Sequence, residues 1–426
     1  MSEVGDVIAE GKTKIVALDE GSMVSIESKD DITAGDGAKH NVVKGKGAIA
    51  NATTCNVFRL LQECGLPVAF RKQVDRKTFQ AVHCNMIPFE VVVRRESHGS
   101  CIQRRPHLKK GQIFPRLVVE FFLKTSGKQW REQALLSDDP LAILNGDSHL
   151  FDLYDPHASV YGQEPFLSIS QPEGFEESYL QEMAHIAQRA FLILEKAWQL
   201  QGRRLVDFKV EFGISASGDP VILLADVIDN DSWRVVDAGE YIDKQAYRDG
   251  QSIRAVMAKY RLVRDLTARF RLPSQRIIIW RGSKQDDLSP FYSAIGDLAW
   301  PEFPVETITD SMHKEPEQGI SLLKQVAQEV PNSVLIVFVG RSNGAGPILS
   351  AHITVPAITV PANYREFPDD IMSSLRTPSK VPVMTILEPG NAVLAALQIL
   401  AMSNPMLYAT LRLEQEKRLI NTFQLH

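Results

Sequence analysis

Several features that would assign the chain to a class of protein are missing from the sequence. No stretch of its 426 residues approaches the apolar run that a membrane-spanning helix needs, and the N-terminus lacks the basic-then-apolar pattern of a secretory signal. The four cysteines are scattered, with no CxxC pair and no metal-ligand spacing. This usage is typical of reduced thiols, so we expect a cytoplasmic protein with no membrane partner.

An excess of positive charge is missing too. The chain carries 47 lysines and arginines against 52 aspartates and glutamates, which gives a net charge of −5. We therefore expect no nucleic-acid partner, and any bound anion must be held by local basic residues. The sequence also contains no internal repeat, no low-complexity segment and no GxxxxGK[ST] phosphate loop.

What the sequence does contain is enough apolar residues, 44% of the total, for more than one buried core. The first two-thirds mixes strand-like pieces such as "EVVVRRE" and "LVVEFFLK" with one periodic helix, "EESYLQEMAHIAQRAFLILEKAWQLQG", which Gly202 ends. From Arg276 the apolar strands "RIIIW", "VETITDS", "SVLIVFVG", "VPAITVP" and "VPVMTIL" alternate with helix-length segments. That alternation predicts a parallel sheet covered by helices on both faces.

The stretches "DFKVEFG" and "LADVIDNDSWR" raise the first question of function. Asp207, Lys209 and Glu211 alternate with apolar residues, so on a strand they share one face. If the link at Ala216–Asp219 is a hairpin, antiparallel counting places Asp226 near position 209, diagonal to Glu211 and roughly 7–8 Å from it. Two such carboxylates suit a magnesium ion that also binds nucleotide phosphates. Taken alone, these residues favour an ordinary solvated strand face.

Three segments nearer the N-terminus favour a nucleotide site over an ordinary solvated strand face. "EGKTK" places Lys12 and Lys14 beside a glycine, which is a combination that would let a hairpin cover nucleotide phosphates. "SKDDITAGDGAKHNVVKGKGAIAN" packs charges and glycines more densely than a structural loop requires. "PFEVVVRRESHGS" ends a strand with an arginine pair before Gly-Ser, which either receives a sugar phosphate or, as is commoner for such a pair alone, is solvated.

These segments, in this order with "LVDFKVEFG" and "ADVIDNDSWR", resemble SAICAR synthetase over nearly the whole of the first part. The resemblance implies an α+β, ATP-grasp-like domain related in fold to protein kinases. It also implies a role in purine biosynthesis, in which L-aspartate is joined to the carboxylate of carboxyaminoimidazole ribonucleotide (CAIR) with ATP and Mg²⁺. Phosphorylation would turn that carboxylate into an acyl phosphate, so the site needs positioning and charge neutralisation more than a protein nucleophile.

The same resemblance implies a role for individual residues. The implied sets are Lys12, Lys14, Lys209 and Glu211 for ATP; Glu211 and Asp226 for Mg²⁺; and Asp36, Lys39, Arg94, Ser100, Asp207, Asp231, Ser232 and Arg234 for CAIR and L-aspartate, with Lys209 also catalytic.

Three loops of the last third carry polar residues after predicted strands: "GSKQDD", "SMHK" and "GRSNGAGP". Ligands bind at such strand ends in parallel sheets, and histidine titrates in the range needed for proton transfer. With "SSLRTPS", these loops resemble class II AIR carboxylase, which implies a flavodoxin-like, three-layer domain. Such a domain adds CO₂ to aminoimidazole ribonucleotide (AIR) to make CAIR, without ATP or biotin.

The second resemblance also implies individual roles. Ser283 and Asp286 would contact the ribonucleotide, His313 would move the C4 proton, and Lys314 would bind substrate. The remaining implied site residues are Ser311, Arg341, Ser342 and Gly344, of which Ser342 and the following glycines would receive CO₂.

The order of the two halves is that of the animal bifunctional enzymes, which implies a homo-octamer assembled through the carboxylase domains. The predicted limits are residues 1–262 for the synthetase domain, 263–274 for a linker and 275–426 for the carboxylase domain. One departure leaves an alternative open. Where the family has "SGNT", this chain has "SAHI" at residues 350–353, so the second domain is alternatively an oligomerisation module with impaired carboxylase activity. A third reading makes the first domain a generic kinase-like nucleotide-binding module.

Overall fold

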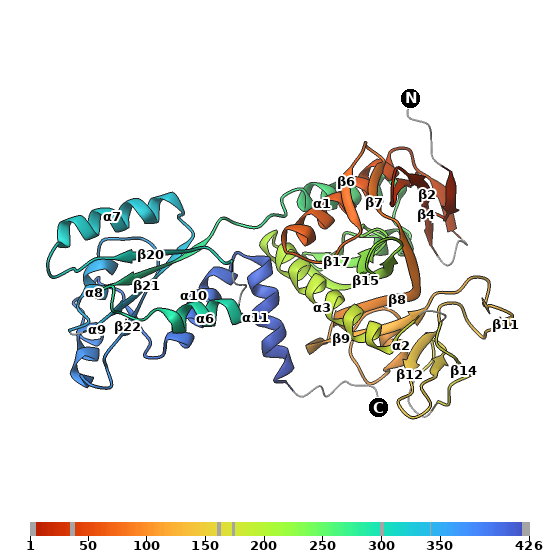
Figure 1. The fold of residues 1–426 in the computed structure, drawn as a ribbon. Coiled ribbons are helices and arrows are strands. Elements are labelled where there is room, and N and C mark those ends of the chain that lie inside the picture. Colours follow the sequence, from red (N-terminus) through yellow and green to blue (C-terminus); the bar gives the residue numbers. More distant parts are fainter. Residues whose placement is uncertain are drawn as a thin grey trace. The chain divides into compact units, whose positions relative to one another are not determined.

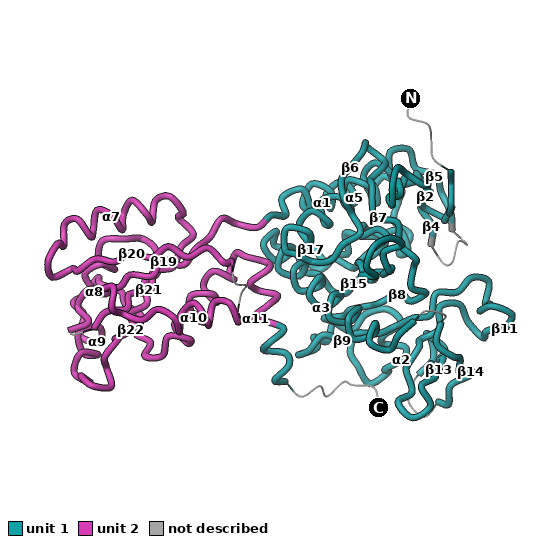
Figure 2. Tube along the Cα trace, in the orientation of Figure 1, with its two compact units in different colours: residues 1–271, 413–426 teal, residues 272–412 magenta. Residues whose placement is uncertain are grey.

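The computed structural model describes residues 6–34, 39–159, 163–172, 175–298, 302–340 and 342–419. The chain forms two compact units, one of Met1–Arg271 with Leu413–His426 and one of Leu272–Arg412 (Figures 1 and 2). The predicted limits at residues 262 and 275 stay a prediction. None of the helices in the described ranges is long and apolar enough to span a membrane.

The first unit contains two main antiparallel sheets. The smaller sheet has the strand order β1-β2-β3-β7-β6. Its strands are β1 (Val7–Glu10), β2 (Lys14–Asp19), β3 (Met23–Ser28), β7 (Thr78–Val82) and β6 (Phe70–Gln73). Helix α1 (Lys46–Glu63) packs against this sheet, where Phe58 stacks on Phe70 with 5.7 Å between the ring centroids. A separate hairpin is formed by β4 (Asp31–Ala34) and β5 (Lys39–Val42).

The larger sheet runs β14-β13-β12-β9-β8-β15-β17-β18, and β16 pairs with β15 off this path. Its strands are β8 (Cys84–Glu96), β9 (Ile113–Leu123), β12 (Leu141–Leu144), β13 (Phe151–Tyr154), β14 (Leu167–Ile169), β15 (Arg204–Ser215), β16 (Ile222–Ala225), β17 (Trp233–Asp237) and β18 (Glu240–Tyr241). A small hairpin of β10 (Gln129–Trp130) and β11 (Gln133–Ala134) projects between β9 and β12.

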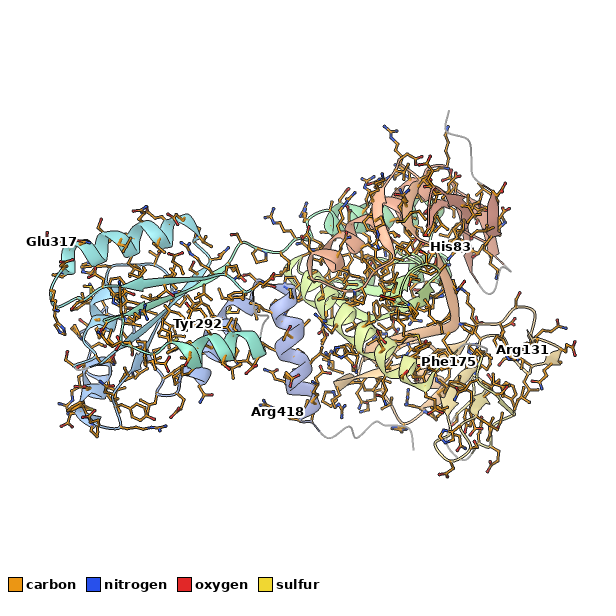
Figure 3. The ribbon with its side chains drawn as sticks, in the orientation of Figure 1. His83, Arg131, Phe175, Tyr292, Glu317 and Arg418 are labelled. Carbon is orange, nitrogen blue, oxygen red and sulfur yellow. The ribbon has the colours of Figure 1, made fainter. Side chains whose placement is uncertain are left out.

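Helix α3 (Glu177–Leu200) is the periodic helix that the sequence predicts, and Gly202 follows it with a left-handed φ of 72°. The helix packs against β15, β8 and β9 through its apolar face. Phe175, labelled in Figure 3, closes one end of this core by packing against Phe89 and Phe151. The shorter helices are α2 (Ser100–Arg104), α4 (Gln245–Arg248) and α5 (Ile253–Thr267).

The hairpin from β15 to β16 differs from the prediction by one residue. Glu211 pairs with Ala225 and Ile214 with Ile222, so continued pairing would set Asp226 opposite position 210 instead of 209. The counting failed because the connection between Ser215 and Ile222 is longer than the predicted Ala216–Asp219. Asp226 lies just past the end of β16 with a left-handed φ of 63°, so strand alternation no longer fixes the direction of its side chain.

The second unit is a five-stranded parallel sheet of order β20-β19-β21-β22-β23. Its strands are β19 (Arg276–Arg281), β20 (Val305–Thr309), β21 (Ser333–Val339), β22 (Ala357–Pro361) and β23 (Met384–Thr385). Its helical elements are α6 (Ser289–Leu298), α7 (Pro316–Glu329), α8 (Ala345–Ser350), η1 (Pro368–Ile371), α9 (Met372–Leu375), α10 (Pro389–Ala401) and α11 (Pro405–Lys417).

Two separate apolar cores cover the two faces of this parallel sheet. Ile277 and Ile279 face α6 and α10, whereas Ile278 and Trp280 face α7 and α8. In chain order the strands are arranged 2-1-3-4-5, which is the flavodoxin-like order of a doubly wound sheet. The predicted three-layer α/β class is therefore confirmed.

A short C-terminal segment, Leu413–Leu419, belongs by its contacts to the first unit. Glu416 on α11 is buried and accepts a 2.7 Å hydrogen bond from the Arg95 guanidinium and a 2.8 Å bond from the Leu117 amide. Arg95 also donates to Glu195 of α3 at 2.7 Å. The segment thus supplies one of two carboxylates that neutralise a buried arginine of β8.

We predict that Glu416→Ala lowers the free energy of unfolding of the first unit by about 2–4 kcal/mol, because it leaves a buried guanidinium short of a partner. Glu414→Ala is the matched control, since Glu414 pairs with exposed Lys417 on the same helix and should cost less than about 1 kcal/mol. Amide hydrogen exchange of β8 and β9 is the measurement. Equal protection in both variants would contradict the prediction.

Candidate functional site

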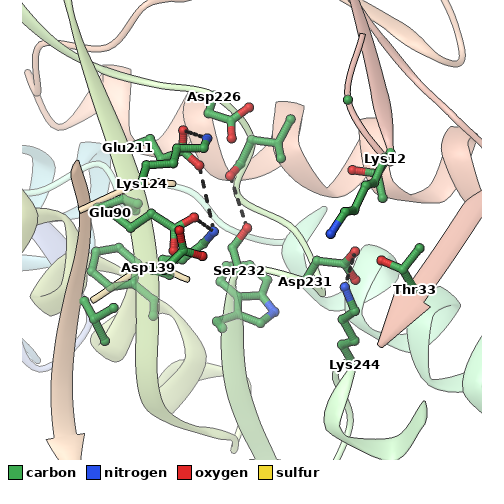
Figure 4. A pocket seen from close by; sticks show the side chains of 18 of the residues that line it. Lys12, Thr33, Glu90, Lys124, Asp139, Glu211, Asp226, Asp231, Ser232 and Lys244 are labelled. Carbon is green, nitrogen blue, oxygen red and sulfur yellow. Dashed lines mark hydrogen bonds and ion pairs between the residues drawn. The ribbon is translucent and has the colours of Figure 1, made fainter. Parts of the chain in front are cut away.

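A cavity of about 710 Å³ in the first unit is lined by residues of both sheets and of the loops between them (Figure 4). Ten of the predicted synthetase residues line it: Lys12, Lys14, Arg94, Asp207, Lys209, Glu211, Asp226, Asp231, Ser232 and Arg234. The structure therefore brings together residues that are more than two hundred positions apart in the sequence. The charged face of β15 is part of a cavity wall and not a solvated surface.

Glu211 and Asp226 both face this cavity, and lysines contact each of them. Lys124 donates to Glu211 at 2.5 Å, and Lys14 forms an ion pair with Asp226. Lys209 lies 3.8 Å from Glu211 and donates to Glu90 at 2.5 Å. A phosphate that binds here would contact lysines that now pair with Glu211 and Asp226. A cation would contact the two carboxylates in place of those lysines.

The electrostatics of the cavity shift the pKa values of Glu211 and Lys209 in favour of their charged forms, whereas the pKa of Lys14 shifts the other way. Burial would raise the pKa of Glu211, but Lys209, Lys124 and Lys14 outweigh it and hold the pKa below its usual range. Burial would lower the pKa of Lys209, and the carboxylates of Glu90 and Glu211 raise it instead. Lys14 is the exception, because burial lowers its pKa from 10.5 to about 8.

Two arginines share one aspartate on the wall of the cavity. Asp207 accepts a 2.8 Å bond from Arg94 and a 2.6 Å bond from Arg234, and Arg94 also donates to buried Glu120 at 2.7 Å. Gly99 lies against this pair with φ 56°, and a Cβ there would be 2.5 Å from the Arg234 guanidinium. A side chain at this position of "SHGS" would therefore be strained by the left-handed backbone and would force the end of the Arg234 side chain to move.

Not every predicted residue lies in this cavity. Ser100 lines an adjoining cavity of about 380 Å³ with Arg94, Lys128 and His157. Asp36 lies outside the described residues, and of Lys39 only the backbone, in β5, is described.

Sequence reasoning also missed several residues. Glu90, Lys124, Asp139, Lys244 and Arg248 line the cavity too. Glu90 could have been found, because it and Arg94 lie on alternate positions of "PFEVVVRRE" and so share a strand face. Lys124 ends "LVVEFFLK", directly after β9, and no local signal marks it as functional.

An apolar cavity of about 410 Å³ adjoins the charged one. It is lined by Val16, Ile26, Phe70 and Met86 among others, and it shares Lys14, Lys124, Glu211 and Asp226 with the charged cavity. The connection between the two sheets, His83–Cys84, borders it; His83 is labelled in Figure 3. A flat apolar ring would fit here with an attached phosphate chain directed toward the lysines.

In the second unit, β20, β19 and β21 are neighbours, so the three predicted loops leave adjacent strand ends. The Nε2 of His313 lies 3.3 Å from the Oγ of Ser342, which joins the loops after β20 and β21. Ser283 donates its amide to Asp286 at 2.9 Å in the loop after β19. The gap between β19 and β21 is the point where the strand order reverses, and ligands bind at such points.

The remaining carboxylase residues are placed as follows. Ser311 donates its amide to Asp310 at 2.6 Å, Lys314 is exposed, and Gly344 directly precedes α8. Arg341 lies outside the described residues. Ser342 itself has a left-handed φ of 64°, so this loop turns sharply next to His313.

The "SAHI" segment begins at Ser350, the last residue of helix α8. Ser350 is buried and its hydroxyl donates to the carbonyl of Pro382, whereas Ala351 and His352 are exposed. Within the chain, the Ala351 methyl group is therefore directed to an open surface and crowds no neighbouring element of the described structure.

Comparison with protein-family models gives two matches. Residues 7–263 match the family described as SAICAR synthetase, and residues 276–419 match AIR carboxylase. Together the two matches cover almost all of the chain, and each coincides with one of the two resemblances in the sequence.

Curated relatives carry the same pair of domains. A probable multifunctional protein of Caenorhabditis elegans is 35% identical over 98% of this chain and 95% of its own length. A human protein named bifunctional phosphoribosylaminoimidazole carboxylase/phosphoribosylaminoimidazole succinocarboxamide synthetase is 34% identical over 96% of this chain and 93% of its own length.

Among solved structures, a SAICAR synthetase in complex with ADP covers 63% of this chain and 100% of its own, at 28% identity with a TM-score of 0.50. That likeness confirms the predicted fold class of the first unit. The chain therefore belongs to the SAICAR synthetase family, in its bifunctional form with an AIR carboxylase domain.

Proposed function

We propose that the first unit joins L-aspartate to the carboxylate of CAIR at the expense of ATP, forming SAICAR, and that the second adds CO₂ to AIR to form CAIR. The observation that carries the synthetase proposal is the convergence of Lys12, Lys14, Lys124 and Lys209 on a cavity that also holds the carboxylates of Glu211 and Asp226. A generic hydroxyl-phosphorylating module is less well supported, because the family match extends over residues 7–263.

The two adjoining cavities suit the two parts of a nucleotide. The apolar cavity accepts adenine, and the lysines at the shared border accept the phosphates. The similar solved protein that was crystallised with ADP supports this assignment. Lys12 and Lys14 extend from the turn between β1 and β2, so they would cover the phosphates from the side of the smaller sheet.

Glu211 and Asp226 fit a magnesium ion that is shared with the nucleotide. Magnesium usually takes one or two carboxylates and completes its shell with phosphate oxygens and water. No group of three or more histidine, cysteine, aspartate or glutamate side chains that could hold a metal occurs in the described part of the chain, so these two would supply only part of the shell. When bound, Mg²⁺ would neutralise charge on the phosphates.

The chain's own residues would then activate and trap the carboxylate of CAIR. An oxygen of that carboxylate attacks the terminal phosphorus of ATP, ADP leaves, and the resulting acyl phosphate is attacked by the amine of aspartate. The amide bond forms as phosphate leaves and the amine loses a proton. Lys209 would stabilise the transferred phosphoryl group, because its raised pKa keeps it charged beside Glu211.

The opposite end of the cavity is suited to the anionic groups of CAIR and aspartate. Arg234, Lys244 and Arg248 line it together with Asp231 and Ser232. Arg94 is buried and already bound to Glu120 and Asp207, so it would contribute charge while Arg234, which is more exposed, makes the direct contact. Ser100, in the adjoining cavity, would extend this anion site.

The carboxylase proposal is carried by the contact between His313 and Ser342. The new carbon–carbon bond joins C4 of AIR to CO₂, and the proton at C4 must leave. His313 would accept it, while Ser342 and the start of α8 would receive the CO₂ oxygens. Ser283 and Asp286, on the loop after β19, and Ser311 and Lys314, on the loop after β20, would bind the ribonucleotide, as would Arg341.

We also propose that the protein is cytoplasmic and assembles into a homo-octamer through its carboxylase units. His313 and Ser342 are exposed in a single chain, so a second copy would be needed to enclose their substrate. Leu375 and Met402, which are 60% and 71% exposed, offer apolar surface on the same unit.

We expect Glu211→Gln to reduce synthetase kcat/KM at least about 100-fold, because it removes a proposed metal ligand, and even outer-shell partners cost 10–100-fold. Calorimetry should show that Mg²⁺ strengthens ADP binding to the unmodified protein but not to this variant. Glu27→Gln, at an exposed position of β3, is the control. Full turnover by Glu211→Gln would mean that the metal site is misplaced.

The lowered pKa of Lys14 predicts pH-dependent nucleotide binding. The side chain is charged below about pH 8 and neutral above it, and a phosphate favours the charged form. The affinity for ADP should therefore fall as pH rises through about 8, and binding above that pH should take up a proton. Titration calorimetry in buffers of different ionisation enthalpy measures the uptake. Lys14→Arg should abolish it, because arginine stays charged throughout.

For the second unit, we expect His313→Asn to remove bicarbonate-dependent formation of CAIR from AIR and to leave synthetase turnover unchanged. Replacing residues 351–353 with Gly-Asn-Thr tests the alternative of an impaired module. A large gain in carboxylase activity on that replacement would support the alternative, whereas full activity of the unmodified chain that depends on His313 would exclude it.

A further inference from the structure

Two buried side chains that do not line the synthetase cavity converge on one carboxylate that does. Asp231 faces the cavity from the loop between β16 and β17. Behind it lie Lys46, at the start of α1, and Tyr260, in α5, each only 1% exposed. The Tyr260 hydroxyl donates to Oδ1 of Asp231 at 3.0 Å, and the Lys46 Nζ lies 3.7 Å from Oδ2.

These contacts fix both oxygens of the carboxylate. Lys244, which does line the cavity, donates to Oδ2 at 3.1 Å, so the substrate side and the buried side of Asp231 hold different partners. Lys244 lines the cavity, where an incoming anion can reach it, whereas Lys46 and Tyr260 are buried on α1 and α5 and line no part of the cavity. The orientation of the Asp231 carboxylate is therefore determined by Tyr260 and Lys46 on its buried side.

The charges of this cluster agree with that role. Burial would raise the pKa of Asp231, but the ammonium groups of Lys46 and Lys244 outweigh it and hold the pKa below its usual range. Burial and the nearby carboxylates raise the pKa of Tyr260 well above its ordinary value. Tyr260 thus keeps its proton and acts as a donor to an ionised acceptor, which is the stronger kind of hydrogen bond.

A purely structural role for Tyr260 would need only its ring. The ring belongs to an apolar core with Ile32, Ile49, Val256 and Met257, and phenylalanine would fill the same space. The hydroxyl group adds nothing to that core, because it extends beyond it to the cavity carboxylate. Tyr247 belongs to the same core and is as deeply buried, but its hydroxyl donates to Asn41 at 2.8 Å.

We propose that Tyr260, supported by Lys46, is a positioning residue of the synthetase site, which orients Asp231 toward an N–H or O–H group of CAIR or L-aspartate. The inference rests on the proposed ligase function of this cavity. It predicts that loss of one hydroxyl group, with the ring retained, impairs the use of these two substrates and leaves nucleotide binding unaffected.

The test compares Tyr260→Phe with Tyr247→Phe in the full-length chain. Tyr260→Phe should raise KM for CAIR or L-aspartate and lower kcat/KM about 10-fold or more, as expected for a lost bond to a charged group. The Kd for ADP should stay within about twofold of the unmodified value. Tyr247→Phe should lose a similar amount of thermal stability while its KM values are unchanged.

Different outcomes test the positioning role of Tyr260 and the ligase function separately. A fall in kcat at unchanged KM, equal in both variants, would mean a structural role and overturn the inference. Unmodified kinetics in Tyr260→Phe would overturn it too. If the unmodified chain releases no ADP with CAIR and L-aspartate present, the ligase function itself fails, and that result is independent of either tyrosine.

Discussion

The synthetase site depends on the pairing of β8 with β15. Asp207 lies opposite Arg94, Lys209 opposite Val92 and Glu211 opposite Glu90 in one continuous antiparallel register. Because side chains alternate along a strand, this register places an acid, a base and a second acid of β15 on the same face as the functional residues of β8. A slip of one residue would bury that charge among α3 and its apolar partners and expose the core.

The same pairing explains why so many charges can be held in one place. Glu120 on β9 accepts bonds from Arg94, Arg104 and Arg105, and these guanidinium groups keep its pKa far below the usual range despite burial. Arg94 and Arg234 are therefore paired with carboxylates of the sheet before any ligand arrives. An anionic substrate therefore meets a wall whose arginines are already held in place, which suits a reaction driven by positioning.

Features of the fold and site that arise from local sequence patterns could be predicted, whereas those set by contacts between distant residues could not. Alternation within "DFKVEFG" gave the charged face of β15, and apolar strands between helices gave the parallel sheet of the second unit, since both are local patterns. The position of Asp226 was missed by one residue, because connection length and a left-handed backbone are set by tertiary packing. Lys124 was not found, because nothing beside it in the chain marks which surface it will meet. Lys46 lies in the segment rich in charges and glycines, but no local pattern shows that it will be buried behind Asp231. The roles implied for individual site residues stay predictions.

The buried contact between Arg95 and Glu416 has a consequence for how the protein is made. Strand β8 emerges from the ribosome early, but the carboxylate that completes its surroundings lies beyond the whole of the second unit. The surroundings of Arg95 therefore cannot be completed until the intervening domain has been synthesised. Vectorial synthesis thus places one of the last packing steps of the first unit after the translation of the second.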